Sequence, residues 1–217
     1  MPRSASIAEL RTLVAAWEPS PLARGRTAVA SGVAGLDEAL GGGLPAGHIV
    51  EVVSAMPGGG GGLMVGALLA STRAAGKRIA LIDATDGFDP CSYRPDHLRH
   101  LVWVRARSLS EAMACTDVLV RDGNYAVTVL DLRGVPVRTM RQQPSSAWHR
   151  IRLAGEQNPG AILVLSATGC IPAVPWRFIL HEGTPLNNLG RTHAERMARL
   201  TLESVRSRDA VKEEMAG

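Results

Sequence analysis

Short apolar runs alternate along the chain with segments in which apolar residues recur every three or four positions. The runs are typical of strands buried on both faces of a sheet, and the periodic segments are typical of helices that cover it. The predicted strands are "HIVEVV" (48–53), the second part of "GKRIALIDA" (76–84), "HLVWVRA" (100–106), "YAVTVLDLRG" (125–134) and "AILVLSATG" (161–169). The alternation therefore predicts an α/β fold, with a mostly parallel, twisted sheet covered by helices on both faces.

The periodic segments predict the helices between these strands. The first carries Val33, Leu36 and Leu40, and we expect Ser31 to cap it and the glycines 41–43 to end it. The others are predicted at 63–75, at 108–123 with Ser108 or Ser110 as the cap, and within 146–160, which ends in a Pro-Gly stop.

The two ends of the chain differ from this pattern. Near the N-terminus, an apolar stripe predicts an amphipathic helix that contains Ile7, Leu10, Leu13, Val14 and Trp17. After Cys170 no clear period remains until "RLTLESV" (199–205), which alternates like an edge strand. We therefore expect an N-terminal helix and linker at 1–27, a core domain at 28–205 and a polar tail at 206–217.

Composition favours a globular protein, because 46% of the 217 residues are hydrophobic and 20% are charged. No secretory signal or membrane span is evident, so we expect a cytoplasmic protein without membrane contact. The three cysteines are too widely spaced for a disulfide framework or a paired metal site. The net charge of +4 comes largely from arginine, since only Lys77 and Lys212 are lysines, and it permits a nucleic-acid partner.

The stretch "SAMPGGGGGL" (54–63) lies between a predicted strand and a predicted helix, where nucleotide-binding proteins keep their phosphate loop. Such a loop holds phosphates with backbone N–H groups and the helix N-terminus. It also needs a lysine for the terminal phosphates and a hydroxyl for magnesium. This stretch has five consecutive glycines and no lysine.

Several quoted segments together resemble the core of bacterial RecA-type recombinases. They are "SGVAGLDEALGGGLPAGHIVEVV", the glycine loop, "AAGKRIALIDATDGFDP" and "YAVTVLDLRG", and the resemblance runs from about Ile7 to Leu165. It implies a RecA-like core, and an N-terminal helix that contacts a neighbouring protomer or a partner through Leu10, Leu13, Val14 and Trp17.

The resemblance also gives a register for the phosphate loop. Ser54 stands in place of its first glycine, Gly59 keeps the second, Gly60 replaces the lysine and Gly61 replaces the hydroxyl residue. The water-activating glutamate falls on Thr85, and of the acidic residues Asp131 is retained, with Asp83 as a second residual acid. Without these groups the chain lacks the electrostatics of phosphoryl transfer. We therefore expect a pseudo-ATPase with no catalytic residues and no cofactor, and we do not expect it to bind ATP.

Other constellations suggest alternative sites. Asp83, Asp86 and Asp89 are spaced three apart and could hold a divalent cation, and His97 and His100 have a spacing compatible with a metal. A polar loop and a solvated turn are the preferred interpretations, so no metal site is predicted.

Two loops face DNA in RecA-type proteins. The first corresponds here to "RGVPVRTMRQQPSSAW", and the candidate contacts to DNA or a partner are Arg133, Arg138, Arg141, Arg150 and Arg152. A solvated basic face is the alternative. The second loop falls within 168–188, where Trp176 and Phe178 favour packing or a partner surface over base stacking.

Among RecA-like proteins, the pattern is most similar to the ImuA family of bacterial mutagenic translesion synthesis. That resemblance implies a non-enzymatic binding or scaffold component of the DNA-damage response. Its expected partners are DNA polymerase subunits of a mutagenesis complex, DNA, and further copies of the chain through the N-terminal helix. The alternatives are a residual ATP- and DNA-binding recombinase and a regulator that resembles cell-division inhibitors.

Overall fold

The computed structural model describes residues 28–55, 59–181, 193–197 and 200–205. Within them, one seven-stranded sheet has the order β3-β2-β4-β5-β1-β6-β7. Its strands are β1 (Ile49–Val53), β2 (Ile79–Asp83), β3 (Leu101–Arg105), β4 (Val127–Asp131), β5 (Ala161–Ser166), β6 (Trp176–Leu180) and β7 (Leu202–Val205). All neighbours are parallel except β6 and β7, which are antiparallel. The α/β class and the edge strand in "RLTLESV" are thus confirmed.

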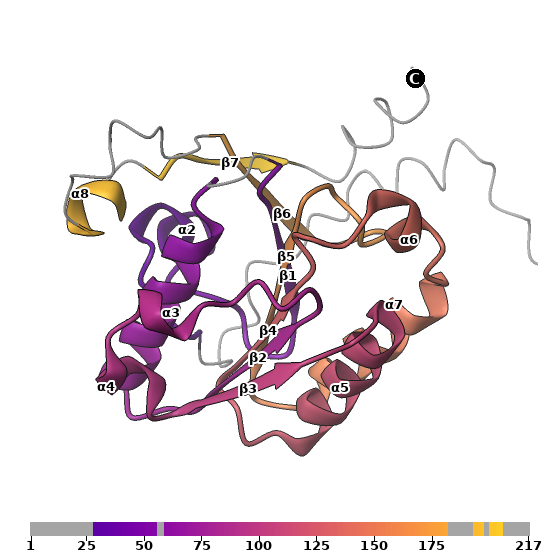
Figure 1. Ribbon diagram of the computed structural model, residues 1–217, viewed down its shortest axis with the longest axis horizontal. Helices are drawn as coiled ribbons and strands as arrows, with labels where there is room; N and C mark the ends of the chain where they lie inside the picture. Colours follow the sequence, from indigo (N-terminus) through magenta and orange to yellow (C-terminus); the bar gives the residue numbers. More distant parts are fainter. Residues whose placement is uncertain (1–27, 56–58, 182–192, 198–199, 206–217) are drawn as a thin grey trace, which may run out of the picture.

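Helices cover both faces of this sheet (Figure 1). One face packs against α2 (Ala34–Ala39) and α3 (Gly61–Ala74), with α4 (Pro95–Leu98) beside α3. The other face packs against α5 (Leu109–Asp122), α6 (Val137–Arg141) and α7 (Ser145–Glu156). A 3-10 turn, η1 (Pro90–Ser92), precedes α4, and α8 (His193–Met197) lies near α3. Alternate residues of each strand face the two cores, which explains the continuous apolar runs in the sequence.

Local hydrogen bonds explain where two of the helices begin. The hydroxyl of Ser108 accepts from the backbone N–H of Glu111, 3.2 Å away, so Ser108 is the cap of α5. The prediction that Ser31 caps the first helix was wrong, because Val33 is the residue that precedes α2. Ser31 instead accepts from Val33 N–H at 3.1 Å, and its own N–H donates to Asp37 of α2 at 2.8 Å.

Strand β6 was not predicted from the sequence. It pairs in parallel with β1, and its Phe178 is 2% exposed in the core beneath α3. Trp176 makes an edge contact with His48, with ring centroids 5.4 Å apart. The two aromatic residues are therefore part of the sheet rather than of a loop. Among the described helices, none is long and apolar enough to cross a bilayer.

Candidate phosphate-loop site

Strand β1 leads into the glycine-rich loop, and the loop leads into α3, as the sequence predicts. Ser54 follows β1 and is 5% exposed; its N–H donates to Ser166 O of β5 at 2.8 Å and its hydroxyl donates to Gly59 O at 3.0 Å. Gly60 precedes α3 with φ +83°, a backbone conformation that favours glycine. The described ends of the loop therefore keep the strand–glycine–helix order of a phosphate loop, and the Ser54 hydroxyl joins them.

The guanidinium of Arg133 lies against the first turn of α3. An added Cβ at Gly61 would fall within contact distance of its Nη1 and 2.9 Å from its Cδ. Asp131, at the end of β4, holds this side chain with two hydrogen bonds, from Nε at 2.9 Å and from Nη2 at 2.5 Å. Arg133 thus fills the position where the resemblance would place a hydroxyl side chain and its metal.

Asp131 stabilises the charged guanidinium of Arg133 in this partly buried place. Burial lowers the pKa of Arg133, but the hydrogen bonds and the negative charge of Asp131 outweigh burial and raise it above the usual value. Asp131 is itself 5% exposed, so its carboxylate has little water and relies on the arginine. The carboxylate of Asp131, the acid retained from the RecA-like pattern, is therefore already paired with a side chain of the same protein.

An aromatic cluster lies next to Arg133. The hydroxyl of Tyr93 donates to Gly62 O of α3 at 3.1 Å. Burial raises the pKa of Tyr93, against the opposing effect of the positive charge of Arg133. Its ring stacks on Phe88 at 5.0 Å, and Phe88 makes an edge contact with Trp103 at 5.2 Å. Tyr93 and Arg133 together cover the start of α3.

The loop after β2 is organised by Asp83, which is fully buried. Its carboxylate accepts from three backbone N–H groups, of Thr85 and Gly87 at 3.1 Å and of Phe88 at 2.8 Å. Thr85 is exposed and lies against the next loop, since an added Cβ at Gly134 would be 2.7 Å from its Oγ1. Position 85, where the resemblance places the water-activating glutamate, therefore carries a neutral side chain.

The alternative metal sites are not assembled in the described part of the chain. Asp86 pairs with Arg105 at 2.5 Å, and Asp89 accepts from the N–H of Cys91 at 2.9 Å. His100 Nε2 contacts Thr72 Oγ1 at 2.8 Å. The described residues contain no group of three or more His, Cys, Asp or Glu side chains that could hold a metal ion.

Sequence reasoning missed a buried ion pair under the loop that follows β5. Glu51, in the middle of β1, is fully buried and accepts from Arg177 Nε of β6 at 2.7 Å. It also accepts from Ser166 Oγ at 3.0 Å and from the N–H of Cys170 at 2.8 Å. The network joins β1, β5, β6 and the start of the following loop. Its one signal in the sequence was the lone charge in "HIVEVV".

The candidate arginines separate into two groups. Arg133 is bound to Asp131, whereas Arg138 and Arg141 on α6 and Arg150 and Arg152 on α7 are exposed. Arg152 contacts His149 at 3.0 Å and Glu156 at 3.9 Å. The predicted contact residues of the N-terminal helix, Leu10, Leu13, Val14 and Trp17, and the polar tail lie outside the described residues.

The comparison with known protein families agrees with the relationship to RecA-type proteins that the fold and the loop suggest. Residues 23–139 match the RecA N-terminal domain, which is more than half of the chain. The match includes the glycine loop, Thr85, Asp131 and Arg133, and it ends within α6. No curated protein matches the chain. By its RecA N-terminal domain, its parallel sheet and the glycine loop between β1 and α3, the chain belongs to the RecA family.

Proposed function

We propose that this RecA-family chain is a catalytically inactive protein that binds partners instead of turning over ATP. Its role would be that of a scaffold component in the bacterial DNA-damage response, in mutagenic translesion synthesis. The observation that carries the proposal is the Arg133 side chain, held by Asp131 against Gly61 of the phosphate loop.

Phosphoryl transfer depends on positioned charges around the terminal phosphate: a lysine, a metal held by a hydroxyl and an acid, and a group that orients the nucleophile. At the corresponding positions this chain has Gly60, Gly61 and Thr85. The remaining acid, Asp131, has both carboxylate oxygens engaged by Arg133. A magnesium ion at Asp131 would have to displace a guanidinium that forms charge-assisted hydrogen bonds.

The packing around the loop supports the same conclusion. At Gly60, a side chain would meet the Cδ2 atom of Leu200 and would need the φ of +83° that disfavours other residues. At Gly61, a hydroxyl side chain would meet Arg133. The surroundings of the loop are thus fitted to glycine at both positions, and restoring the lysine and the hydroxyl would require other residues to move.

The binding surface that we assign to this function is formed by α6 and α7. Arg138, Arg141, Arg150 and Arg152 are exposed on these two helices, which lie on the same face of the sheet (Figure 1). Arginine is suited to bidentate contacts with phosphates or carboxylates. This surface would bind DNA or an acidic region of a polymerase subunit, and the segment 1–27 would provide a second contact.

ATP turnover by the purified full-length chain tests the inactive site. We expect the rate of phosphate release to equal that of the Gly61→Asp variant, whose added carboxylate would repel a nucleotide phosphate and can pair with Arg133. An aspartate in the first turn is compatible with the helix dipole, but its Cβ would displace Arg133, so thermal unfolding checks that this control remains folded. Turnover by the wild type that exceeds the control and rises to saturation with ATP would contradict the proposal.

Recovery of partners from cells tests the scaffold role. After DNA damage, the tagged full-length chain should co-purify with polymerase subunits, and a variant with Arg138, Arg141, Arg150 and Arg152 changed to Gln should recover less of them. The wild type should bind no more polymerase subunits than an unrelated tagged protein if the scaffold role is wrong. Filamentous cells on overproduction, with no polymerase recovered, would instead favour a regulator of division.

A further inference from the structure

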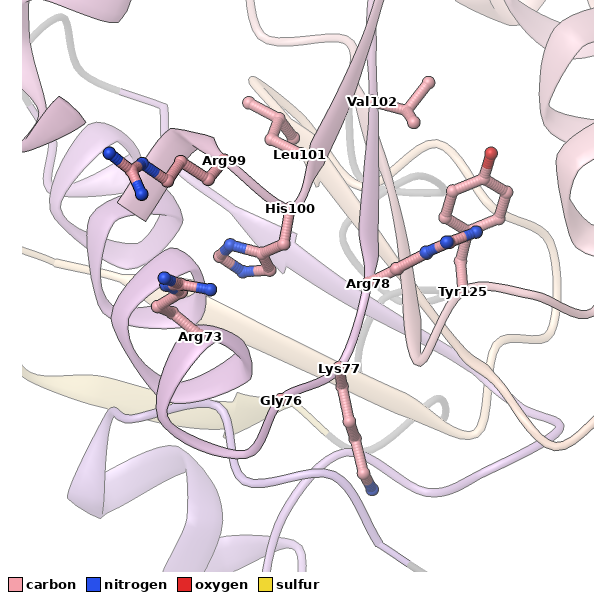
Figure 2. Close-up of a pocket in the computed structure, with 9 residues that line it drawn as sticks. All are labelled: Arg73, Gly76, Lys77, Arg78, Arg99, His100, Leu101, Val102 and Tyr125. Atoms are coloured by element: carbon pink, nitrogen blue, oxygen red, sulfur yellow. The ribbon is translucent and has the colours of Figure 1, made fainter. Parts of the chain in front are cut away.

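A basic hollow lies at the edge of the sheet opposite the phosphate loop, where β2 and β3 begin. Its volume is about 420 Å³, and its charged and aromatic lining is formed by Arg73, Lys77, Arg78, Arg99, His100 and Tyr125. Figure 2 shows Arg73, Arg99 and His100 together on the α3 side of the strands, and Arg78 extended toward Tyr125 on the other side. The Lys77 side chain points away from both groups. We name these six residues the basic hollow.

The fold explains why these residues meet. Arg73 lies in the last turn of α3, and Gly76, with φ +65°, turns the chain through Lys77 and Arg78 into β2. Because parallel strands start at the same edge, His100 before β3 and Tyr125 before β4 lie beside Arg78. The backbone bonds from Ile79 N–H to His100 O, at 3.2 Å, and from Ala126 N–H to Arg78 O, at 2.9 Å, hold them there.

The charge of the basic hollow is only partly balanced. Asp96 of α4 pairs with Arg73 at 3.0 Å and with Arg99 at 3.9 Å. Lys77 and Arg78 form no ion pair within the described part of the chain, and no carboxylate lines the hollow. The basic hollow thus carries an excess of positive charge. Favourable contact of cations with the C-terminal end of the α3 dipole does not account for so many of them.

We propose that the basic hollow binds the phosphate backbone of a single-stranded nucleic acid. Several cations in one concavity suit a chain of phosphates, and guanidinium groups bind phosphate oxygens in pairs. Tyr125 lies beside Arg78 and offers a ring on which an unpaired base can stack. An acidic peptide would use the same charges but would gain nothing from stacking, so the nucleic acid is the better match.

This inference goes beyond the function proposed above and concerns another surface. The basic hollow lies where the strands begin, whereas the phosphate loop and the loop that leads to α6 lie where they end. A strand bound in the hollow would therefore leave the α6 and α7 arginines available to a second partner. Substitutions can therefore remove the charges of either surface and leave the other surface unchanged.

Fluorescence anisotropy with a labelled 20-nucleotide oligothymidine tests the proposal, on the full-length chain over a range of salt concentrations. The test variant is Lys77→Gln with Arg78→Gln. The matched control is Arg107→Gln with Arg121→Gln, which removes the same charge from exposed positions on the α5 side. Thermal unfolding checks that both variants remain folded.

We expect the test variant to bind about tenfold more weakly at low salt. Its slope of log affinity against log salt should be smaller by about 1.4, since a lost phosphate contact on a single strand removes about 0.7. The control should stay within about twofold of the wild type. A Tyr125→Leu variant should lose affinity with no change in salt slope, because stacking releases no counterions.

Four results would overturn the proposal. The first is that the wild type does not bind the oligonucleotide at low salt, and the second is that the test and control variants lose affinity equally. The third is that polyglutamate displaces the strand as well as unlabelled oligothymidine does at equal charge concentration, which would assign the hollow to acidic peptides. The fourth is that binding depends only on the α6 and α7 arginines, which would leave the proposed scaffold function standing and rule this one out.

Discussion

Arg133 packs against Gly61, and this contact leaves no room for a side chain at position 61. The guanidinium lies where a side chain at 61 would begin, and Asp131 fixes it there through Nε and Nη2. The position of Arg133 therefore requires glycine at 61, because any other residue would place a Cβ atom in the space that the guanidinium occupies. The relationship makes the loop and β4 interdependent.

This relationship predicts a stability coupling between the two positions. Gly61→Ala should lower the free energy of unfolding by about 1–2 kcal/mol, because its methyl group displaces Arg133 from a mostly buried carboxylate. In an Arg133→Ala background the same change should cost nothing or stabilise. Denaturant unfolding of the two single variants and the double variant measures the coupling.

Gly62→Ala provides the matched control for that cycle. Its added Cβ would meet only the Tyr93 hydroxyl, at an ordinary 3.6 Å. We expect this change to stabilise α3 by about 0.5–1 kcal/mol, as Gly→Ala does at helical positions without strain. Equal effects at 61 and 62, with no dependence on Arg133, would contradict the packing described here.

The buried ion pair predicts that removing Arg177 alone costs much more stability than removing both charges. Arg177→Met leaves the fully buried Glu51 without its cation and should lower the free energy of unfolding by about 3–5 kcal/mol. Adding Glu51→Gln should recover much of this loss, because glutamine is neutral and its oxygen can still accept from the N–H of Cys170. Chemical denaturation of both variants measures the difference. The ion pair would be dispensable if the single variant lost less than about 1 kcal/mol.

The cysteines should differ in reactivity. Burial raises the pKa of the Cys170 thiol far above its usual range, and the neighbouring charge of Glu51 raises it further. Since the thiolate is the reactive form, Cys170 should resist iodoacetamide at pH 8 in the folded protein, whereas the exposed Cys91 should react. Mass spectrometry of timed samples gives the two rates, and both residues should react after denaturation. Comparable rates in the folded state would contradict the raised pKa of the partly buried Cys170 thiol.

His100 predicts a loss of stability in acid. Burial lowers the pKa of its imidazole, and the positive charges of Arg73 and His97 lower it further, against the opposing effect of Asp96. The Thr72 hydroxyl donates to Leu68 O, so His100 Nε2–H donates to that hydroxyl, and a second proton would enter the buried Nδ1, which has no hydrogen-bond partner among the described residues.

The sign follows from the two states. The unfolded imidazole takes up a proton near pH 6.5, and the folded one only at lower pH, so the unfolded state binds more protons as the pH falls. The free energy of unfolding should therefore decrease from pH 7.5 to pH 5.5, and His100→Gln should reduce that decrease. An NMR titration of His100 with a midpoint at or above 6.5 would refute the assignment.

Much of the fold was predictable because its strands are buried on both faces. The runs around Val50, Leu81, Val129 and Leu163 contain little but apolar residues, and the glycine loop sits between the first strand and its helix. Strand β6 escaped prediction because Arg177 interrupts it and prolines precede it. Helix α6 escaped because it has five residues between Pro136 and Pro144.

The site was predictable in its position but not in its contents. The loop lies between β1 and α3 as expected, since a strand followed by glycines and a helix is a local pattern. The turn of Arg133 back onto Asp131 depends on the tertiary packing of β4 against α3, which no local period encodes. The same holds for Glu51 and Arg177, which lie far apart in the sequence and become neighbours only in the sheet.

The strand order has a consequence for how the chain acquires its structure during synthesis. Strands β2, β3 and β4 pair with one another and are complete by residue 131, but β1 pairs only with β5 and β6, which begin at residues 161 and 176. The glycine loop therefore gains its supporting strand neighbours late, after a segment of slow, long-range contacts. A nascent chain that stops at the end of the matched region, residue 139, holds every residue of the phosphate loop and neither of the strands that would set it in place.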